Sequence, residues 1–339
     1  MKKLISIMLI LTLVFLMGCS SEEEKKPEVP QQDMQIESVE ELTDNEFIQM
    51  LSTDTRPLAV MIDNDGPSSR PQIGVESAYI VYEVIVEGGA SRMMALFKNN
   101  TIEKVGPIRS SRHYFLDYAL EHDAIYLHAG WSPKATTDIK SLGVNNINGI
   151  QGDDGVIFYR DNTYDNTYHN LYTSVKDAYE YAGKKKYDAT SDIEYTWYYD
   201  KDTDLKNAQS ATEVSVPYSS MYTVNYKYNS DTKVYDRYIG SNLHMSQTGN
   251  NLTAKNIIVC YVRNYPLNDG QNKDRQEVDT VGSGKGYYIT NGKAIEITWS
   301  KASRTAKTVY KDADGNELKI NPGNLYIQIV PQTSAVTVK

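Results

Sequence analysis

The chain has 339 residues, with 44 acidic side chains against 35 lysines and arginines, and a formal net charge of -9. This acidic balance argues against a nucleic-acid-binding protein and against a protein that lies flat on anionic lipid. The length is sufficient for two ordinary domains, each with its own core.

The N-terminus carries the pattern of an export signal. Lys2 and Lys3 precede an apolar run from Leu4 to Met17, and Gly18 stands directly before Cys19. The run is short for a membrane helix and polar sequence follows it, so residues 1–18 are expected to be removed. A small residue before a cysteine is typical of lipoprotein processing, in which the thiol receives a lipid. We therefore expect an extracytoplasmic protein whose membrane partner is reached through lipidated Cys19, with an ordinary signal peptide as the alternative.

Processing leaves a more acidic chain with a single free thiol. Removal of residues 1–18 takes away two lysines and no acid, so the net charge becomes -11. Residues 19–45 are rich in Glu, Lys, Pro and Gln and are expected to form a flexible tether. Once Cys19 is acylated, Cys260 has no partner for an intrachain disulfide. It lies in the apolar run Asn256–Val262, which predicts a buried strand.

Residues 46–207 alternate between strand and helix patterns, which predicts an N-terminal mixed α/β sheet domain. A weak helical period over 41–51 precedes it. The expected strands are 57–63, 79–86, 92–98, 124–128 and 156–159, with 79–86 and 92–98 forming a hairpin. The expected helices are 110–122 with a serine cap, 132–142 with Pro133 at its first position, and 173–183.

From residue 208 to 339 the helical periods stop and short strands follow one another, so we expect a β-rich C-terminal domain and an α+β fold overall. Asn291-Gly292 predicts a tight hairpin because both positions tolerate positive φ. Gly282–Gly286 is interpreted as a turn. The chain holds 27 tyrosines, which we interpret chiefly as sheet-surface residues, with a ligand groove as the alternative.

Three motif matches are rejected on context. No helix is expected after Gly282–Gly286, so that segment does not cradle a phosphate. Ser230–Lys233 occupies a hairpin turn and does not begin a helix, unlike the nucleophile motif of penicillin-binding proteins. Asp312–Glu317 has Gly323 where a calcium loop needs glutamate. His113, His122 and His128 lack the spacing of zinc ligands, so no metal and no cofactor are expected.

One group of residues points to a binding site. Polar side chains follow the ends of several expected strands, and the loop 106–113 adds arginines and a histidine. If the strands are parallel, their carboxyl ends open on one crevice, and arginines there favour a carboxylate or phosphate ligand. The candidate ligand-binding residues are Asp63, Glu87, Arg92, Arg109, Arg112, His113, His128, Arg160 and His169.

The same residues permit a purely structural interpretation. Asp63, Glu83 or Glu87 could each pair with Arg92, Arg109 or Arg112 and join loops together without binding any ligand. Both interpretations remain open at the level of the sequence.

The chain resembles the YerB-type lipoproteins of Gram-positive bacteria. The resemblance rests on segments spread over both halves: 56–64, 70–72, 80–83, 86–89, 106–112, 128–130, 169–172, 252–257, 282–284, 292–293, Trp299 and 321–323. It implies a two-part domain of unknown function, with no established reaction to transfer. Asp65 stands where the family often has histidine, and Leu325-Tyr326 where tryptophan is common.

Three functional hypotheses follow. The first is a non-catalytic binding or scaffold protein of the cell envelope, in which Arg109, Arg112 and His128 hold an anionic or glycan ligand and Asp63 and Glu87 orient them. Its partner would be a cell-wall polymer, an anionic ligand or an envelope protein, and not nucleic acid. The second is a hydrolase of the wall or of a phosphate ester, with Asp63 or Glu87 as base and His128 or His113 as acid. The third is an adaptor that binds another protein through edge strands.

Overall fold

The computed structural model describes residues 42–98, 101–271 and 273–339. The export signal, the lipidation site Cys19 and the tether up to residue 41 lie outside this range. The α-helices of the described residues all fall in the N-terminal half: α1 (Asp44–Leu51), α2 (His113–Glu121), α3 (Pro133–Ser141) and α4 (Val175–Lys184). Short 3-10 turns are η1 (Pro67–Ser69), η2 (Val75–Ser77) and η3 (Glu87–Gly89). None of these helices has the length and apolar character to cross a bilayer.

The strands of the N-terminal half are β1 (Leu58–Ile62), β2 (Ile80–Ile85), β3 (Ser91–Phe97), β4 (Ile125–His128), β5 (Asn146–Asn148), β6 (Tyr159–Arg160) and β7 (Leu171–Tyr172). Those of the C-terminal half are β8 (Gln209–Ser210), β9 (Glu213–Pro217), β10 (Thr223–Asn229), β11 (Val234–Ile239), β12 (Asn242–Leu243), β13 (Thr253–Ala254), β14 (Asn256–Val262), β15 (Asn264–Pro266), β16 (Gln276–Val278), β17 (Gly282–Thr290), β18 (Lys293–Lys301), β19 (Val309–Lys311), β20 (Leu325–Pro331) and β21 (Thr337–Val338). The predicted α+β class is confirmed.

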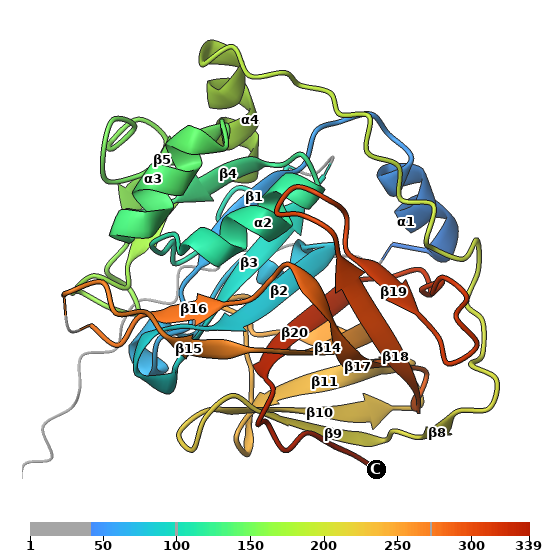
Figure 1. Cartoon of the computed structure of the whole chain (residues 1–339). Coiled ribbons are helices and arrows are strands. Elements are labelled where there is room, and N and C mark those ends of the chain that lie inside the picture. The colour runs from blue at the N-terminus through green and yellow to red at the C-terminus, as the bar shows by residue number, and fades with distance from the viewer. Residues whose placement is uncertain (1–41, 99–100, 272) are drawn as a thin grey trace, which may run out of the picture. The chain divides into compact units, whose positions relative to one another are not determined.

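One large sheet contains strands from both halves, in the order β19-β18-β17-β14-β20-β2-β3-β1-β4-β5 (Figure 1). Strand β20, near the C-terminus, inserts between β14 and β2 and is parallel to both. Strands β1 and β2 are each antiparallel to β3 and so run in the same direction, and β4 is parallel to β1. The carboxyl ends of β1, β2 and β4 therefore meet at one edge of the sheet.

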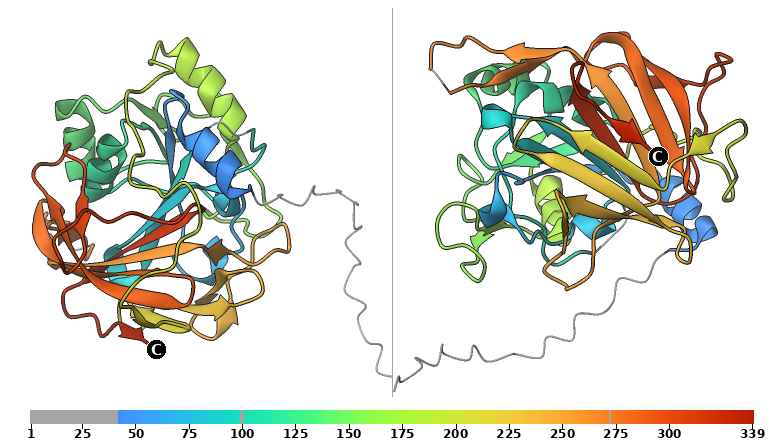
Figure 2. Two further views of the ribbon diagram at one scale, coloured as in Figure 1. Left: turned by 90° about the vertical axis from the view of Figure 1, so that its right-hand side faces the viewer. Right: turned by 90° about the horizontal axis from the view of Figure 1, so that it is seen from below.

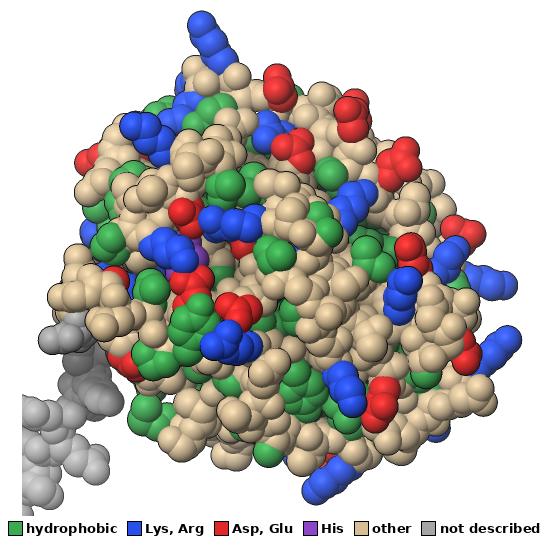
Figure 3. All heavy atoms as spheres, viewed as in Figure 1, with side chains coloured by type: hydrophobic (Ala, Val, Ile, Leu, Met, Phe, Trp, Pro, Cys, Tyr) green, Lys and Arg blue, Asp and Glu red, His purple; other side chains and the backbone are tan. Residues whose placement is uncertain are grey.

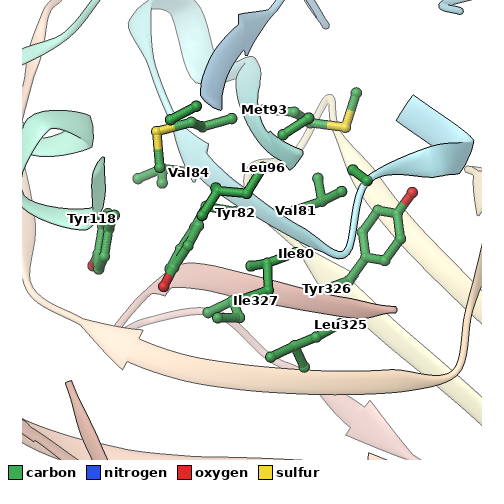
Figure 4. Packing of buried hydrophobic residues seen from close by; sticks show 14 of the residues in the cluster. Ile80, Val81, Tyr82, Val84, Met93, Leu96, Tyr118, Leu325, Tyr326 and Ile327 are labelled. Atoms are coloured by element: carbon green, nitrogen blue, oxygen red, sulfur yellow. The ribbon is translucent and has the colours of Figure 1, made fainter. Parts of the chain in front are cut away.

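Each face of this sheet is covered by a different layer. Helix α2 covers one face, where Tyr82 of β2 stacks on Tyr118 with ring centroids 4.7 Å apart (Figure 4). On the other face lies a smaller sheet in the order β12-β11-β10-β9-β21, which the right-hand view of Figure 2 shows from below. Tyr326 of β20 is paired in register with Val81, so its ring lies on this second face, against Tyr226 of β10.

The core explains why these runs form strands. Every residue of β1, β2, β3 and β20 is buried, as expected for central strands covered on both faces. Cys260 lies in the buried strand β14 and is 2 % exposed, which confirms its predicted place in the core.

The division at residue 208 remains a prediction. The structure joins both halves through the β2–β20 pairing, and the described residues from 42 onward form one compact unit by their backbone contacts. Sequence periodicity does not show which strands pair with each other. The expectation of two separate domains therefore did not include a sheet that contains strands of both halves.

Several local predictions are confirmed. Ser132 caps α3 and accepts a hydrogen bond from Ala135 N, with Pro133 at the first helical position. Asn291 and Gly292 form the turn between β17 and β18 with φ values of 50° and 69°. The expected hairpin of β2 and β3 is also present.

Others are wrong. Helix α2 has Arg112 at its N-cap with no side-chain cap, because the Ser111 hydroxyl accepts from Tyr126 instead. Residues 156–158 do not form a strand, and only Tyr159 of that run belongs to one. Gly282–Gly286 is the start of β17 and not a turn, although no helix follows it. A Cβ on Gly286 would lie 2.0 Å from Val259 O, so glycine here permits close strand pairing.

The tyrosines are mostly interior residues, contrary to the sheet-surface interpretation. The smaller sheet and α2 both pack on the large sheet, and tyrosine rings fill these interfaces. The hydroxyl of Tyr114 donates to Ile85 O, whereas that of Tyr326 has no hydrogen-bond partner among the described residues. The buried tyrosines are Tyr79, Tyr82, Tyr114, Tyr118, Tyr126, Tyr172, Tyr195, Tyr198, Tyr218, Tyr222, Tyr226, Tyr235, Tyr288, Tyr310 and Tyr326.

Candidate functional site

The loop 106–113, which we call the arginine loop, lies between the carboxyl ends of β1 and β4. Asp63 N donates to Pro107 O at 2.8 Å, and Arg109 N donates to Met61 O at 2.9 Å. On the other side, Ala129 N donates to Arg109 O at 3.0 Å. The edge where a crevice was expected is thus occupied by backbone, and the loop's side chains are held on a rigid sheet.

The start of the arginine loop depends on Gly106. Its φ is +146°, and a Cβ there would lie 2.9 Å from both Leu171 O and a ring carbon of Tyr172. Because Ile108 N also donates to Leu171 O at 2.7 Å, strand β7 and the arginine loop are directly bonded. Only glycine allows this approach without a shift of backbone.

Asp63, Arg109 and His169 form the first group, which we call the aspartate–histidine group. His169 Nδ1 lies 2.7 Å from Asp63 Oδ2, and Arg109 Nε lies 3.1 Å from the same oxygen. Asp65 Oδ2 is 3.7 Å from Arg109 Nη2. Asp63 is fully buried, whereas 20 % of the Arg109 side chain is exposed. Arg109 Nε has no well-aligned hydrogen-bond acceptor among the described residues, despite its distance to Asp63.

The segment 159–170, which we call the tyrosine loop, carries His169 into this group. It is closed by the pairing of β6 with β7 and by Arg160 Nη1, which donates to Asn170 Oδ1 at 2.5 Å. The Tyr168 ring lies 4.2 Å from the His169 ring and 4.8 Å from the Arg109 guanidinium. Arg160 therefore closes the loop and does not contact Asp63 or Arg109 directly.

Glu87, Arg92 and Arg112 form a second group with Arg275 of the C-terminal half. Glu87 accepts from Arg112 Nε at 2.5 Å, and its carboxylate lies 3.9 Å from Arg92 and 3.6 Å from Arg275. Burial raises the pKa of Glu87, but Arg112 and Arg92 outweigh it, so the pKa is lowered overall. This group matches the structural interpretation, since it joins η3, the arginine loop and Arg275, the residue directly before strand β16.

Arg92 lies between the two groups. Its Nη1 donates to Ser110 O at 2.6 Å, which fixes the arginine loop. Burial and the nearby Arg112 lower the pKa of Arg92 to about 10, while Glu87 and Asp63 raise it. Both carboxylates therefore lie close enough to Arg92 to raise its pKa. Acidic and basic side chains are intermixed on the face of the molecule that Figure 3 draws.

His113 and His128 lie apart from Asp63. His113 Nε2 is 2.8 Å from Glu277 of β16, whose other oxygen accepts from Lys134 at 2.5 Å. Burial raises the pKa of Glu277, but His113 and Lys134 lower it to about 2. His128 is fully buried, its ring nitrogens facing Gly130 O and Asn146 Oδ1 at 2.8 and 3.2 Å, and burial lowers its pKa. Neither histidine is bonded to the aspartate–histidine group.

A fully buried ion pair between the two halves was missed by the sequence analysis. Arg237 Nη2 lies 2.7 Å from Glu83 Oε2, and both side chains are 0 % exposed. Glu83 Oε1 also accepts from Ser91 and Tyr222, at 2.5 and 2.7 Å. Arg237 further contacts His244. Glu83 was named only as a possible partner of nearby arginines, because nothing in the sequence links it to residue 237.

A second buried cluster lies under α2. Glu121 accepts from Lys301 at 2.6 Å and from Thr308, and it also contacts Tyr82. His122, 2.9 Å from the Tyr82 hydroxyl, has its pKa lowered to about 4 by burial. These contacts hold the edge strands of the large sheet against the N-terminal half.

Metal ligands and a surface groove are the two remaining features that bear on ligand binding. Within the described ranges, no three His, Cys, Asp or Glu side chains are arranged to hold a metal ion. A groove of about 290 Å³ lies on the smaller sheet, away from the arginine loop. It is lined by Glu213, Val214, Ser215, Asn225, Tyr226, Lys227, Tyr238, Gly240, Ser241, Thr337 and Lys339.

The fold and site define an α+β protein whose two parts share one sheet, with an arginine loop at its edge. Comparison with known families assigns both parts. Residues 42–188 match the "Protein of unknown function (DUF3048) N-terminal domain", and residues 214–327 match the corresponding C-terminal domain. The chain belongs to this family, as the resemblance to YerB-type proteins predicted.

A curated relative covers both parts. "Putative lipoprotein YerB" of Bacillus subtilis (strain 168) is 31% identical over 294 residues, which is 84% of each chain. The crystal structure of the Bacillus subtilis YerB protein superposes with a TM-score of 0.74 at 28% identity, covering 84% of this chain and 94% of the other.

Proposed function

We propose that this protein is a lipid-anchored, extracytoplasmic binding protein of the cell envelope, in which Arg109 holds an anionic ligand without catalysing a reaction. The membrane anchor would be the lipid on Cys19, consistent with the name given to its Bacillus relative. Two acyl chains are sufficient for stable anchoring, since each buried methylene contributes about 0.8 kcal/mol.

The Arg109 guanidinium carries the proposal. It is fixed by a loop bonded to β1, β4 and β7, its side chain is partly exposed, and its two carboxylate neighbours contact it only through the buried Nε at 3.1 Å and through Nη2 at 3.7 Å. A carboxylate or phosphate accepts two parallel N–H bonds from such a side chain. The second group helps to keep the Arg109 guanidinium in place, because Glu87 binds Arg112 and Arg92 binds Ser110 O, and both contacts hold the arginine loop.

The test is the binding of two acidic probes, disaccharide-peptide fragments of peptidoglycan and a phosphate-containing wall polymer, measured by calorimetry. Arg109→Ala should weaken the binding of at least one probe by roughly tenfold or more, since a charge-assisted hydrogen bond is worth about 1.5–3 kcal/mol. The matched control is Arg263→Ala, because Arg263 is also paired with an aspartate but is 66% exposed at another strand end. Equal affinities for both probes in wild type and Arg109→Ala would overturn the proposal.

A hydrolase is a second candidate, favoured by the 2.7 Å separation of His169 Nδ1 and Asp63 Oδ2. A carboxylate that holds Nδ1 orients an imidazole so that Nε2 can take a proton from water. The partners differ from those of the sequence hypothesis, which paired Asp63 or Glu87 with His128 or His113. Release of products from the same fragments, lost in His169→Ala, would support this role, and unchanged fragments after prolonged incubation with wild type would contradict it.

A further inference from the structure

The tyrosine loop contains a repeated unit. Residues 161–168 read Asp-Asn-Thr-Tyr twice in succession. In the first copy, Asp161 Oδ1 accepts from Thr163 N at 2.9 Å and from its hydroxyl at 2.5 Å. In the second, Asp165 Oδ2 accepts from Thr167 N and its hydroxyl at 2.9 and 2.6 Å. The two copies therefore fold as the same aspartate turn, and each turn is followed by a tyrosine.

Both tyrosines present their rings to solvent. Tyr164 is 48% exposed and Tyr168 is 59% exposed, and Tyr159 at the base of the loop is 43% exposed. This contrasts with the many tyrosines of the core. Exposed aromatic rings are costly to leave uncovered, and they are enriched at surfaces that bind a partner.

The two turns that carry these tyrosines are held in place before any ligand arrives. Lys104 bonds Asp161 at 2.6 Å, and this bond together with Thr163 lowers the pKa of Asp161 to about 2, so the turn stays charged and closed. Asp165 also accepts from His169 N at 3.1 Å, which ties the second turn to the aspartate–histidine group. A surface ordered in advance loses little conformational freedom on binding.

The charged groups of the loop bear on the type of partner. Asp161 and Asp165 lie in the two turns, Lys104 bonds Asp161, and the Arg109 guanidinium lies 4.8 Å from the Tyr168 ring. Hydrogen-bonding groups of both signs therefore lie close to the exposed rings, and Arg109 is a cation that a ligand carboxylate can reach. A sugar ring places its C–H face on an aromatic ring and its hydroxyls on carboxylate, amide and threonine groups, which this loop supplies beside each tyrosine.

We propose that the tyrosine loop is a sugar-stacking surface, with Tyr164 and Tyr168 contacting successive rings of an acidic wall glycan whose carboxylate reaches Arg109. This inference rests on the proposed function and names its ligand as a glycan. The Tyr168 ring connects the tyrosine loop to Arg109. The Arg109 guanidinium lies 4.8 Å from the centre of this ring, and Tyr168 is 59% exposed.

The experiment compares three probes: the disaccharide-peptide fragment, its free peptide stem, and a neutral tetramer of N-acetylglucosamine. Tyr164→Ala and Tyr168→Ala should each weaken the two sugar-containing probes by roughly fivefold to tenfold, equivalent to the 1–1.4 kcal/mol of an aromatic contact. Peptide-stem binding should be unchanged. Saturation-transfer NMR on the bound disaccharide-peptide should show the strongest transfer to sugar-ring protons and should lose it in Tyr168→Ala.

The matched control is Tyr265→Ala. Tyr265 is 38% exposed and stacks on Arg263 at 4.8 Å, the same separation as Tyr168 and Arg109, but on strand β15. Wild-type affinity for both sugar-containing probes in the two loop variants would overturn the inference. The proposed function would survive that result if Arg109→Ala still weakened the acidic fragments. Loss of a protein partner in cross-linking, with sugar affinity unchanged, would also overturn it by assigning the surface to protein binding.

Discussion

His169 Nδ1 lies 2.7 Å from Oδ2 of Asp63, although 106 residues separate them in the chain. Asp63 directly follows β1, whereas His169 is carried by the tyrosine loop to the same sheet edge. Arg109 contacts the same carboxylate oxygen at 3.1 Å. One buried carboxylate thus positions both the cation that we assign to ligand binding and the neighbouring imidazole.

Asp63→Asn should weaken both ligand binding and the fold. The amide keeps the shape of the side chain but removes the charge that faces Arg109 and His169. We expect a loss of about 1–3 kcal/mol in the free energy of unfolding, measured with urea. Asp279→Asn is the control, since its pairing with Arg263 is solvent-exposed and should contribute less than about 1 kcal/mol. Similar small losses in both variants would contradict a structural role for Asp63.

Gly106→Ala should disturb the arginine loop. Its Cβ would lie 2.9 Å from Leu171 O at a φ of +146°, so the backbone must shift. We expect destabilisation of about 1–3 kcal/mol and weaker binding of acidic fragments. Gly315→Ala is a suitable control, because that glycine also has positive φ but nothing lies within 4 Å of its Cβ. A loss in Gly106→Ala no larger than in the control would show that close approach is unimportant.

The buried ion pair of Glu83 and Arg237 should stabilise the fold only when both residues are present. Arg237→Met leaves a buried carboxylate without its cation and should cost about 3–5 kcal/mol. Adding Glu83→Gln should recover part of that loss, because the neutral side chain still accepts from Ser91 and Tyr222. A double-mutant cycle by chemical unfolding measures the coupling. Additive losses would mean that the pair does not act as a unit.

Stability should decline in mildly acidic solution because of buried histidines. The pKa of His122 is lowered from 6.5 to about 4 by burial, so between these values the unfolded chain binds a proton that the folded protein does not. The free energy of unfolding therefore falls as pH falls, by up to about 1.4 kcal/mol per pH unit for each such group. His128 and His244, whose pKa values burial also lowers, add to this slope.

His122→Gln tests this account by removing one titrating group. The slope of stability against pH between 6.5 and 4 should decrease by about one proton, whatever the variant does to stability at neutral pH. An unchanged slope would indicate that His122 is already protonated in the folded protein.

Much of the fold follows from local patterns, whereas its assembly does not. The α3 cap at Ser132, the Asn291-Gly292 turn and the buried strand around Cys260 are set by neighbouring residues, and all three were predicted. The insertion of β20 beside β2 is a non-local pairing between residues more than 240 positions apart, and no periodicity encodes it.

The site shows the same division. Asp63, Arg109 and His169 were each selected as polar residues near strand ends or in loops, and the structure brings them together. His128 was selected for the same reason, yet it faces the interior, because a residue on the last position of a central strand can point to either face of the sheet. The tandem Asp-Asn-Thr-Tyr unit was the available signal for the tyrosine loop and was overlooked.

The most direct test is a crystal structure of the protein soaked with the disaccharide-peptide fragment. We predict a ligand carboxylate within hydrogen-bond distance of the Arg109 guanidinium and a sugar ring against Tyr168. Ligand bound only in the groove beside Asn225 and Tyr238, with the arginine loop unchanged, would contradict the central claim.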